Sequence, residues 1–160
     1  MNYHIDIQHA CAETIVVSDE ILKQWIINVL QSHLPMGEMT LRFVSENDIA
    51  ELNNTYRKVN KPTNVLAFPA KIPPTVQLEL PLLGDLIVCP KVLEHESIQL
   101  NISLIAHSAH IIIHGVLHLL GYDHLTEDES VEMQAQEIKQ LMQYGFENPY
   151  KNHAEECKID

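Results

Sequence analysis

The sequence has few cysteines, few basic residues and no long hydrophobic run. Cys11, Cys89 and Cys157 are odd in number and far apart in the 160-residue chain. This spacing argues against a disulfide framework or a cysteine-based zinc knuckle and is typical of free thiols in a reducing cytoplasm. No segment approaches the roughly 20 consecutive apolar residues that span a bilayer, and the first residues lack the basic and apolar regions of a signal peptide. We therefore expect a cytoplasmic protein without a membrane segment.

Basic residues are scarce, since 10 Lys and Arg stand against 22 Asp and Glu, for a formal net charge of -12. That charge opposes a broad nucleic-acid-binding surface. Arg57, Lys58 and Lys61 nevertheless lie within five positions and allow a local positive patch. We interpret the acidic residues of the C-terminal third as solvated surface; they are Glu127, Asp128, Glu129, Glu132, Glu137, Glu155 and Glu156.

Hydrophobic periodicity predicts strands in the first part of the chain and helices in the last part. Strands are expected over residues 3–8, 39–43, 64–68 and 82–89, with a further edge strand over 76–80. Helices are expected after Ser18, after Ser45, over 90–96, over 101–120 and after Thr126. This order predicts an α+β fold: residues 1–147 form a single domain with one mixed β-sheet packed with helices, and residues 148–160 form a polar, flexible tail.

The expected helix over 101–120 ends in a segment with three histidines, His114, His118 and His124. Four helical residues advance about 400°, so the first two histidines lie about 40° apart on one face, one turn from each other. Gly121 can adopt a left-handed backbone, end the helix and allow the chain to bring His124 to the same ion. Three neutral nitrogen ligands with one open position are typical of a catalytic zinc site. The sequence thus predicts one Zn2+ per chain on a central helix.

The histidine spacing is that of the zinc-peptidase motif H-E-x-x-H-x-x-G-x-x-H, but Gly115 replaces its glutamate. That glutamate is the general base that activates water for peptide hydrolysis. Its absence favours metal-assisted chemistry on something other than a peptide. The histidine spacing leaves two alternatives open. The first is a zinc metallopeptidase, and the second is that these histidines only pack in the core as part of an apolar helix.

Four further polar residues could support such a site. His107 and His110 share the helix face of the first two ligands, and we interpret both as packing residues or as residues that orient those ligands. Asp123 directly precedes the third histidine and could orient a ligand imidazole or a water molecule. Asp85 lies in an apolar strand, where a carboxylate needs a partner such as a backbone amide or a ligand histidine. Purely structural roles are the alternative for both aspartates.

Arg57 ends an expected helix and begins the basic loop 57–61. A guanidinium binds phosphate through two parallel hydrogen bonds and stays charged at physiological pH. A metal beside an arginine suits a phosphodiester, whose negative charge grows toward the transition state. Arg57 is therefore the candidate catalytic residue, and Lys58 and Lys61 are candidates for further contacts to the phosphates of such a substrate. An arginine that only stabilises the C-terminus of its helix is the alternative.

Three blocks of the sequence resemble the bacterial YbeY family. Residues 114–124 are similar to the family signature HGxLHLxGYDH, and residues 52–57 with 62–69, and 83–87, agree in the same order. Together the blocks cover about residues 50–125. The family commonly shows Thr-Asp-Val-Leu-Ser-Phe-Pro where this chain has Asn64 and Ala67, and neither change removes a candidate ligand or Arg57.

This resemblance implies a zinc-dependent, single-strand-specific endoribonuclease that acts in rRNA maturation, including 3′-end processing of the small-subunit rRNA, and in ribosome quality control. By position, it implies that His114, His118 and His124 hold the metal and that Arg57 is functionally important. The nucleophile would be either water or the ribose 2′-hydroxyl. Expected partners are single-stranded RNA or rRNA and the ribosome or its proteins. A ribosome-assembly RNA-binding protein with a structural zinc is the alternative from another class.

Overall fold

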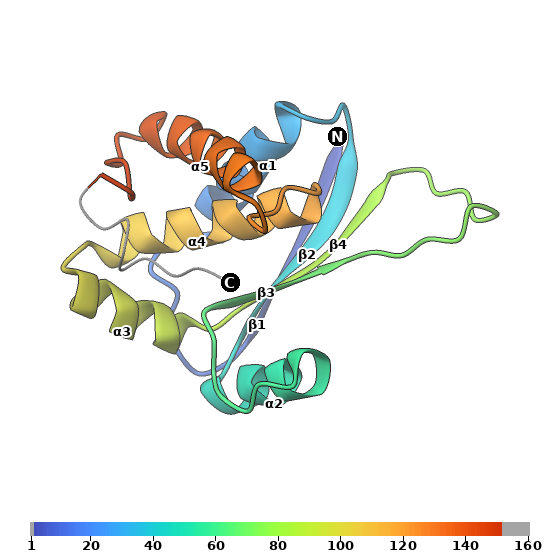
Figure 1. The fold of residues 1–160 in the computed structure, drawn as a ribbon. Helices are drawn as coiled ribbons and strands as arrows, with labels where there is room; N and C mark the ends of the chain where they lie inside the picture. Colours follow the sequence, from blue (N-terminus) through green and yellow to red (C-terminus); the bar gives the residue numbers. More distant parts are fainter. Residues whose placement is uncertain (1, 152–160) are drawn as a thin grey trace.

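The fold is a mixed β-sheet packed with helices (Figure 1), in a computed structural model that describes residues 2–151. The strands are β1 (Tyr3–Ala10), β2 (Gly37–Val44), β3 (Val65–Pro69) and β4 (Leu82–Val88). The helices are α1 (Asp19–Gln31), α2 (Glu46–Arg57), α3 (Pro90–Leu100), α4 (Leu104–Leu119) and α5 (Glu127–Met142). The prediction of an α+β fold with one mixed sheet is thus confirmed.

The sheet has the strand order β1-β2-β4-β3. β1 and β4 run parallel to β2, and β3 runs antiparallel to β4. β3 and β4 continue into a long arm, residues 70–81, that extends away from the helices (Figure 1). The edge strand expected over 76–80 is wrong, because residues 76–78 have no regular structure and residues 79–80 form a bend. Pro73 and Pro74 have no N–H to donate to a ladder.

Gly84 fixes how closely β3 approaches β4. Its φ is 137°, and a Cβ at this position would lie only 2.2 Å from the carbonyl oxygen of Phe68. The register between β2 and β4 also shifts here, at Glu38 and Met39. This irregularity therefore depends on a residue without a side chain.

Helix α4 is the centre of the molecule and contacts α1, α3, α5, β3 and β4. Every residue from His107 to Leu117 is buried, as expected for a helix covered on all sides. It begins three residues later than predicted, because Asn101 ends α3 in a left-handed conformation with φ 57° and Ser103 caps α4. On the other side of the sheet, α2 packs through Ile49 onto a smaller apolar cluster. The histidine-bearing helix is thus held by most of the fold.

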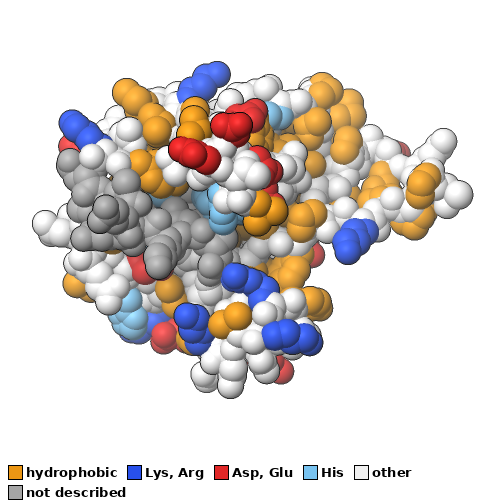
Figure 2. Space-filling view, in the orientation of Figure 1, with side chains coloured by type: hydrophobic (Ala, Val, Ile, Leu, Met, Phe, Trp, Pro, Cys, Tyr) orange, Lys and Arg blue, Asp and Glu red, His pale blue; other side chains and the backbone are white. Residues whose placement is uncertain are grey.

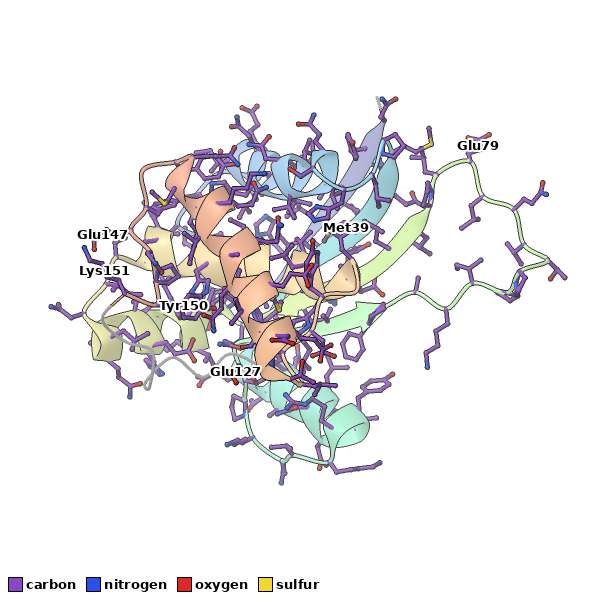
Figure 3. The ribbon with its side chains drawn as sticks, turned by 45° about the horizontal axis from the view of Figure 1, so that its top comes forward. Met39, Glu79, Glu127, Glu147, Tyr150 and Lys151 are labelled. Atoms are coloured by element: carbon purple, nitrogen blue, oxygen red, sulfur yellow. The ribbon has the colours of Figure 1, made fainter. Side chains whose placement is uncertain are left out.

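The packed part of the chain extends beyond the predicted boundary at residue 147. The Tyr150 hydroxyl hydrogen bonds to the buried Glu137, and the Tyr150 ring lies edge-on to His110 at a centroid distance of 5.3 Å. Figure 3 shows Tyr150 beside the helices, far from Glu79 on the arm. The rest of the expected tail, residues 152–160, lies outside the described residues.

Within the described residues, no single helix is long and apolar enough to cross a membrane. Only α3 and α4 taken together reach that length and composition, and a bend of 120° separates them.

Candidate metal centre

Gly121 ends α4 and turns the chain back, as the sequence predicts. Its φ is 104°. The N–H of Tyr122 donates to the carbonyl of Leu117 at 3.0 Å, and the N–H of Gly121 donates to that of His118 at 3.0 Å. This pair of hydrogen bonds is a Schellman motif, which satisfies the last carbonyls of the helix. The chain then returns past the helix end, so that His124 lies beside the two helical histidines.

His114, His118 and His124 form a cluster that could hold a metal ion. Each offers one ring nitrogen, and these atoms all lie within 4.8 Å of one another. The ring of His118 lies 4.5 Å from that of His114 and 5.1 Å from that of His124, between centroids. His114 is buried and the other two are partly buried. Among the described residues, no other group of three His, Cys, Asp or Glu side chains meets this geometry.

Hydrogen bonds at the Nδ1 atoms of His114 and His118 determine which ring nitrogens present a lone pair to the centre of the cluster. Nδ1 of His114 lies 2.7 Å from a carboxylate oxygen of Glu137, and Nδ1 of His118 lies 3.0 Å from the carbonyl of Tyr122. Both acceptors lack a proton, so both Nδ1 atoms must donate. The neutral rings then carry lone pairs on their Nε2 atoms, which lie only 3.0 Å apart. Two facing lone pairs repel each other unless a cation lies between them, so the arrangement fits a metal ion.

The surroundings of His124 also fit a metal ion. Nε2 of His124 is buried and has no hydrogen-bond partner among the described residues. An unpaired buried polar atom is costly, and coordination of a metal would satisfy it. Asp123 accepts the backbone N–H of His124 at 2.8 Å, and so this aspartate holds the backbone of the third candidate ligand rather than its imidazole.

Burial, followed by the nearby His114 and His124, lowers the pKa of His118 to about 4. This pKa is below that of a histidine in the unfolded chain, about 6.5. The stabilisation from neutral His118 is therefore present above about pH 6.5 and is lost as the pH falls through 4. Burial also lowers the pKa of His110, which acts in the same direction.

We therefore expect the metal-free protein to lose thermal stability between pH 6.5 and pH 4, and a His118→Gln variant to lose less over the same range. Melting temperatures measured in chelator at several pH values check this. Because His110 is intact in both proteins, the difference between their curves isolates His118. Parallel curves would contradict the prediction.

Glu137 is the site residue that the sequence interpretation missed. The prediction that Glu137 belongs to the solvated surface is wrong, because its side chain is fully buried between α5 and α4. One oxygen lies 2.7 Å from Nε2 of His110, and the other lies 2.7 Å from Nδ1 of His114. Burial raises the pKa of Glu137, but the hydrogen bonds from His110 and then His114 outweigh it and hold the pKa at about 2. A charged carboxylate thus fixes the ring of one candidate ligand.

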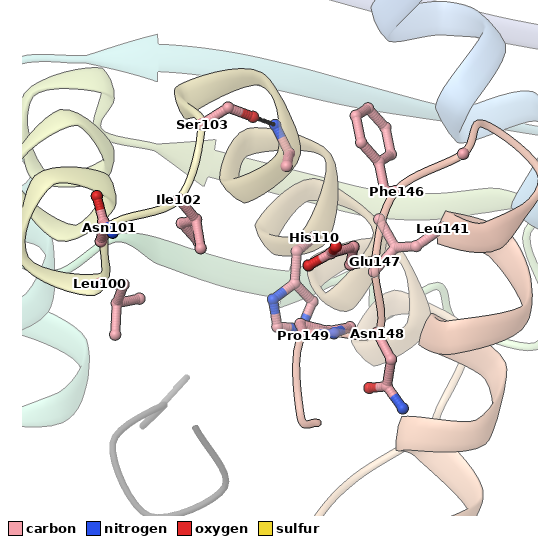
Figure 4. Close-up of a pocket in the computed structure, with 12 residues that line it drawn as sticks. Leu100, Asn101, Ile102, Ser103, His110, Leu141, Phe146, Glu147, Asn148 and Pro149 are labelled. Carbon is pink, nitrogen blue, oxygen red and sulfur yellow. Dashed lines mark hydrogen bonds between the residues drawn. The ribbon is translucent and has the colours of Figure 1, made fainter. Parts of the chain in front are cut away.

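The two earlier histidines of α4 have carboxylate partners outside the cluster. Nε2 of His107 lies 2.9 Å from Glu96 of α3, which Asn64 also approaches at 3.3 Å. Asn64 can donate to Glu96, whereas the aspartate common in the family pattern would repel it unless one of the two were protonated. His110, paired with Glu137, borders a cavity of about 390 Å³ between the α3–α4 connection and residues 145–149 (Figure 4).

A groove of about 560 Å³ opens beside the histidine cluster. Arg57 lines it together with His118, His124 and Asp123, so the fold brings the candidate arginine to the candidate metal site. In Figure 2, Lys and Arg side chains gather over α2 and the loop after it, histidine is visible above them, and acidic side chains lie higher, over α5.

Three candidates from the sequence lie outside this groove. Lys58 ends α2 in a left-handed conformation, and its ammonium group lies 3.3 Å from the carbonyl of Thr55. The backbone carbonyl of Lys61 accepts a hydrogen bond from buried Asn53. Asp85 is exposed, and no hydrogen bond joins it to the described histidines. The expectation that its carboxylate needs a partner in the protein is therefore wrong, because this position of β4 is exposed to solvent.

Comparisons with known proteins identify the family of the chain. The family profile described as endoribonuclease YbeY matches residues 7–145. The endoribonucleases YbeY of Legionella pneumophila strains Corby and Lens are each 49% identical over 151 residues, which cover 94% of this chain and 96% of theirs. The solution structure of TM1509 from Thermotoga maritima superposes with a TM-score of 0.62 and 26% identity, covering 96% of this chain and 99% of that one. The chain therefore belongs to the YbeY family of endoribonucleases, enzymes that cleave phosphodiester bonds within RNA.

Proposed function

We propose that this chain is a zinc-dependent endoribonuclease that cleaves single-stranded RNA. We further propose that it acts in rRNA maturation, including 3′-end processing of the small-subunit rRNA, and in ribosome quality control. Family membership supports the reaction class. The observation that carries the metal dependence is the pair of Nε2 lone pairs of His114 and His118, 3.0 Å apart, beside the unpartnered Nε2 of His124.

His114, His118 and His124 would hold the zinc ion. Three neutral imidazoles suit zinc better than magnesium or calcium, which prefer oxygen ligands. When bound, zinc supplies Lewis acidity to the phosphodiester and activates the nucleophile. Glu137 would keep Nδ1 of His114 protonated, so that Nε2 stays available as a donor atom.

Arg57 would hold the scissile phosphate. It lines the groove that contains His118 and His124, and a guanidinium can bind two phosphate oxygens at once. Its fixed charge would stabilise the negative charge that grows on the phosphate during cleavage.

Single-stranded rRNA suits both the size of the groove and the charge of the protein. A groove of about 560 Å³ can take one or two unpaired nucleotides, whereas a double helix presents a broad, rigid surface. With a net charge of -12, the protein lacks the excess of basic residues that a wide RNA-binding surface requires. Other parts of the ribosome, RNA or protein, would therefore supply part of the affinity of this protein for its rRNA substrate.

The direct test is cleavage of a short single-stranded RNA by the zinc-loaded protein and by Arg57→Ala. We expect kcat to fall about 100-fold to 1000-fold, as when one transition-state donor is removed, while binding weakens much less. Zinc content should be unchanged, and Arg57→Lys should recover part of the activity. An inactive wild-type protein, or an Arg57→Ala variant with normal kcat, would contradict the proposal.

Salt dependence tests the proposed contacts of Lys58 and Lys61. If each of three basic residues neutralises one phosphate, the slope of log K against log salt is near −2, at about −0.7 per phosphate for single strands. Replacing both lysines by alanine should flatten this slope by about 1.4 without loss of zinc. Lys23 and Lys139 lie outside the basic loop 57–61, and their replacement by alanine provides a matched double-variant control. An unchanged slope would place the RNA elsewhere on the protein.

A further inference from the structure

Tyr56 is unusually exposed for an aromatic residue beside a partly buried site. Its side chain lies on the last turn of α2 and is 63% exposed. It lines the same groove as the adjacent Arg57 and as His118 and His124. An exposed aromatic ring gives little stability to the fold, because its apolar surface stays in water.

The ring of Tyr56 is nevertheless held in place. Phe68 of β3 contacts it edge-on, with ring centroids 5.0 Å apart and an interplanar angle of 65°. Phe68 is partly buried and packs against the cluster under α2. Edge-to-face packing of this kind limits the movement of the Tyr56 ring without stacking a second ring on its face. The ring is thus exposed but oriented.

We propose that Tyr56 stacks on an unpaired nucleobase next to the phosphate held by Arg57, an inference that rests on the proposed function. Unpaired bases stack on aromatic side chains, and the interaction tolerates any sequence because every base has a π face. Arg57 and Tyr56 are neighbours in the chain, so phosphate and base of adjacent nucleotides would be bound from one helix end. A base inside a duplex is already stacked and paired, so this subsite favours single strands.

Tyr56→Ala and Tyr56→Phe separate the ring from the hydroxyl. Stacking on an aromatic ring stabilises a bound base, so Tyr56→Ala should weaken the binding of a short single-stranded RNA about 10-fold, whereas Tyr56→Phe should stay within about twofold. In cleavage by the zinc-loaded enzyme, the loss should appear mainly in KM rather than in kcat. Ile98→Ala removes an apolar side chain that is 71% exposed on α3 and should change neither quantity.

RNA with a single abasic position identifies the stacked base. At one position beside the cleaved bond, loss of the base should weaken binding to the wild-type protein about 10-fold but leave binding to Tyr56→Ala nearly unchanged. Equal losses in both proteins at every position, or normal binding by Tyr56→Ala, would overturn the proposal.

Binding is measured with the full chain as purified and again after removal of metal. This separates the stacking subsite from the proposed activity. A coupling between Tyr56 and one base without zinc-dependent cleavage would sustain the subsite and refute the function. Cleavage without the coupling would sustain the function and refute the subsite. Absence of RNA binding by the wild-type protein would overturn the subsite and the function together.

Discussion

Replacing His124 by alanine should remove zinc from the protein and abolish RNA cleavage. The loop after Gly121 positions His124, and its buried Nε2 has no other partner among the described residues. Zinc binding contributes about 10–16 kcal/mol in structural sites with four ligands, or about 3 kcal/mol per ligand. Loss of one ligand should therefore weaken zinc binding more than 100-fold. Zinc per chain, measured after dialysis against a chelator of known affinity, checks this.

His95→Ala is the matched control, since this histidine is exposed on α3 and lies outside the cluster. It should retain about one zinc per chain and full activity. Full zinc content in His124→Ala would show that the third ligand is misassigned. Loss of activity with zinc retained would instead assign His124 to the reaction rather than to the metal.

Replacing Gly84 by alanine should destabilise the protein more than the same replacement at any of its other glycines. The new Cβ would lie 2.2 Å from the carbonyl oxygen of Phe68 and 2.9 Å from the backbone of Ala70, and φ of 137° is strained for any L side chain. Backbone cannot yield as a flexible side chain does, so β3 must separate from β4. We expect a loss of more than about 4 kcal/mol, the range of exceptional substitutions, or failure to fold.

Gly121→Ala provides the comparison. Its φ of 104° is also positive, but no atom lies within 4 Å of the added Cβ. Only conformational strain remains, worth about 1–3 kcal/mol. Chemical denaturation of both variants measures the difference. Equal losses would mean that β3 does not approach β4 as closely as described.

The candidate ligands could be predicted from sequence because their geometry is mostly local. Two lie one helical turn apart, and the third follows a glycine whose conformation depends on its immediate neighbours. Glu137 is 23 residues from His114, and only the packing of α5 on α4 joins them. One signal existed in the sequence: Glu137 shares the buried face of α5 with Met133, Gln140 and Leu141, and an acid on such a face requires a partner.

Long-range contacts also explain the other differences. Arg57 reaches the groove because of how α2 packs beside β3, which no local pattern encodes. The strand expected over 76–80 has suitable alternation, but a strand forms only where another strand pairs with it. Tyr150 falls in a polar segment, and only the tertiary structure reveals its bond to Glu137.

Gly115 limits how this histidine cluster could be converted into a peptidase site. A Cβ there would lie 2.3 Å from the side chain of Leu86, which is fully buried in β4. Glutamate introduced at this position would enter the interface between helix and sheet, where an unpaired charge is strongly unfavourable. One substitution therefore cannot convert this histidine cluster into a peptidase site. That change would require α4 to move away from the sheet, and hence a different core.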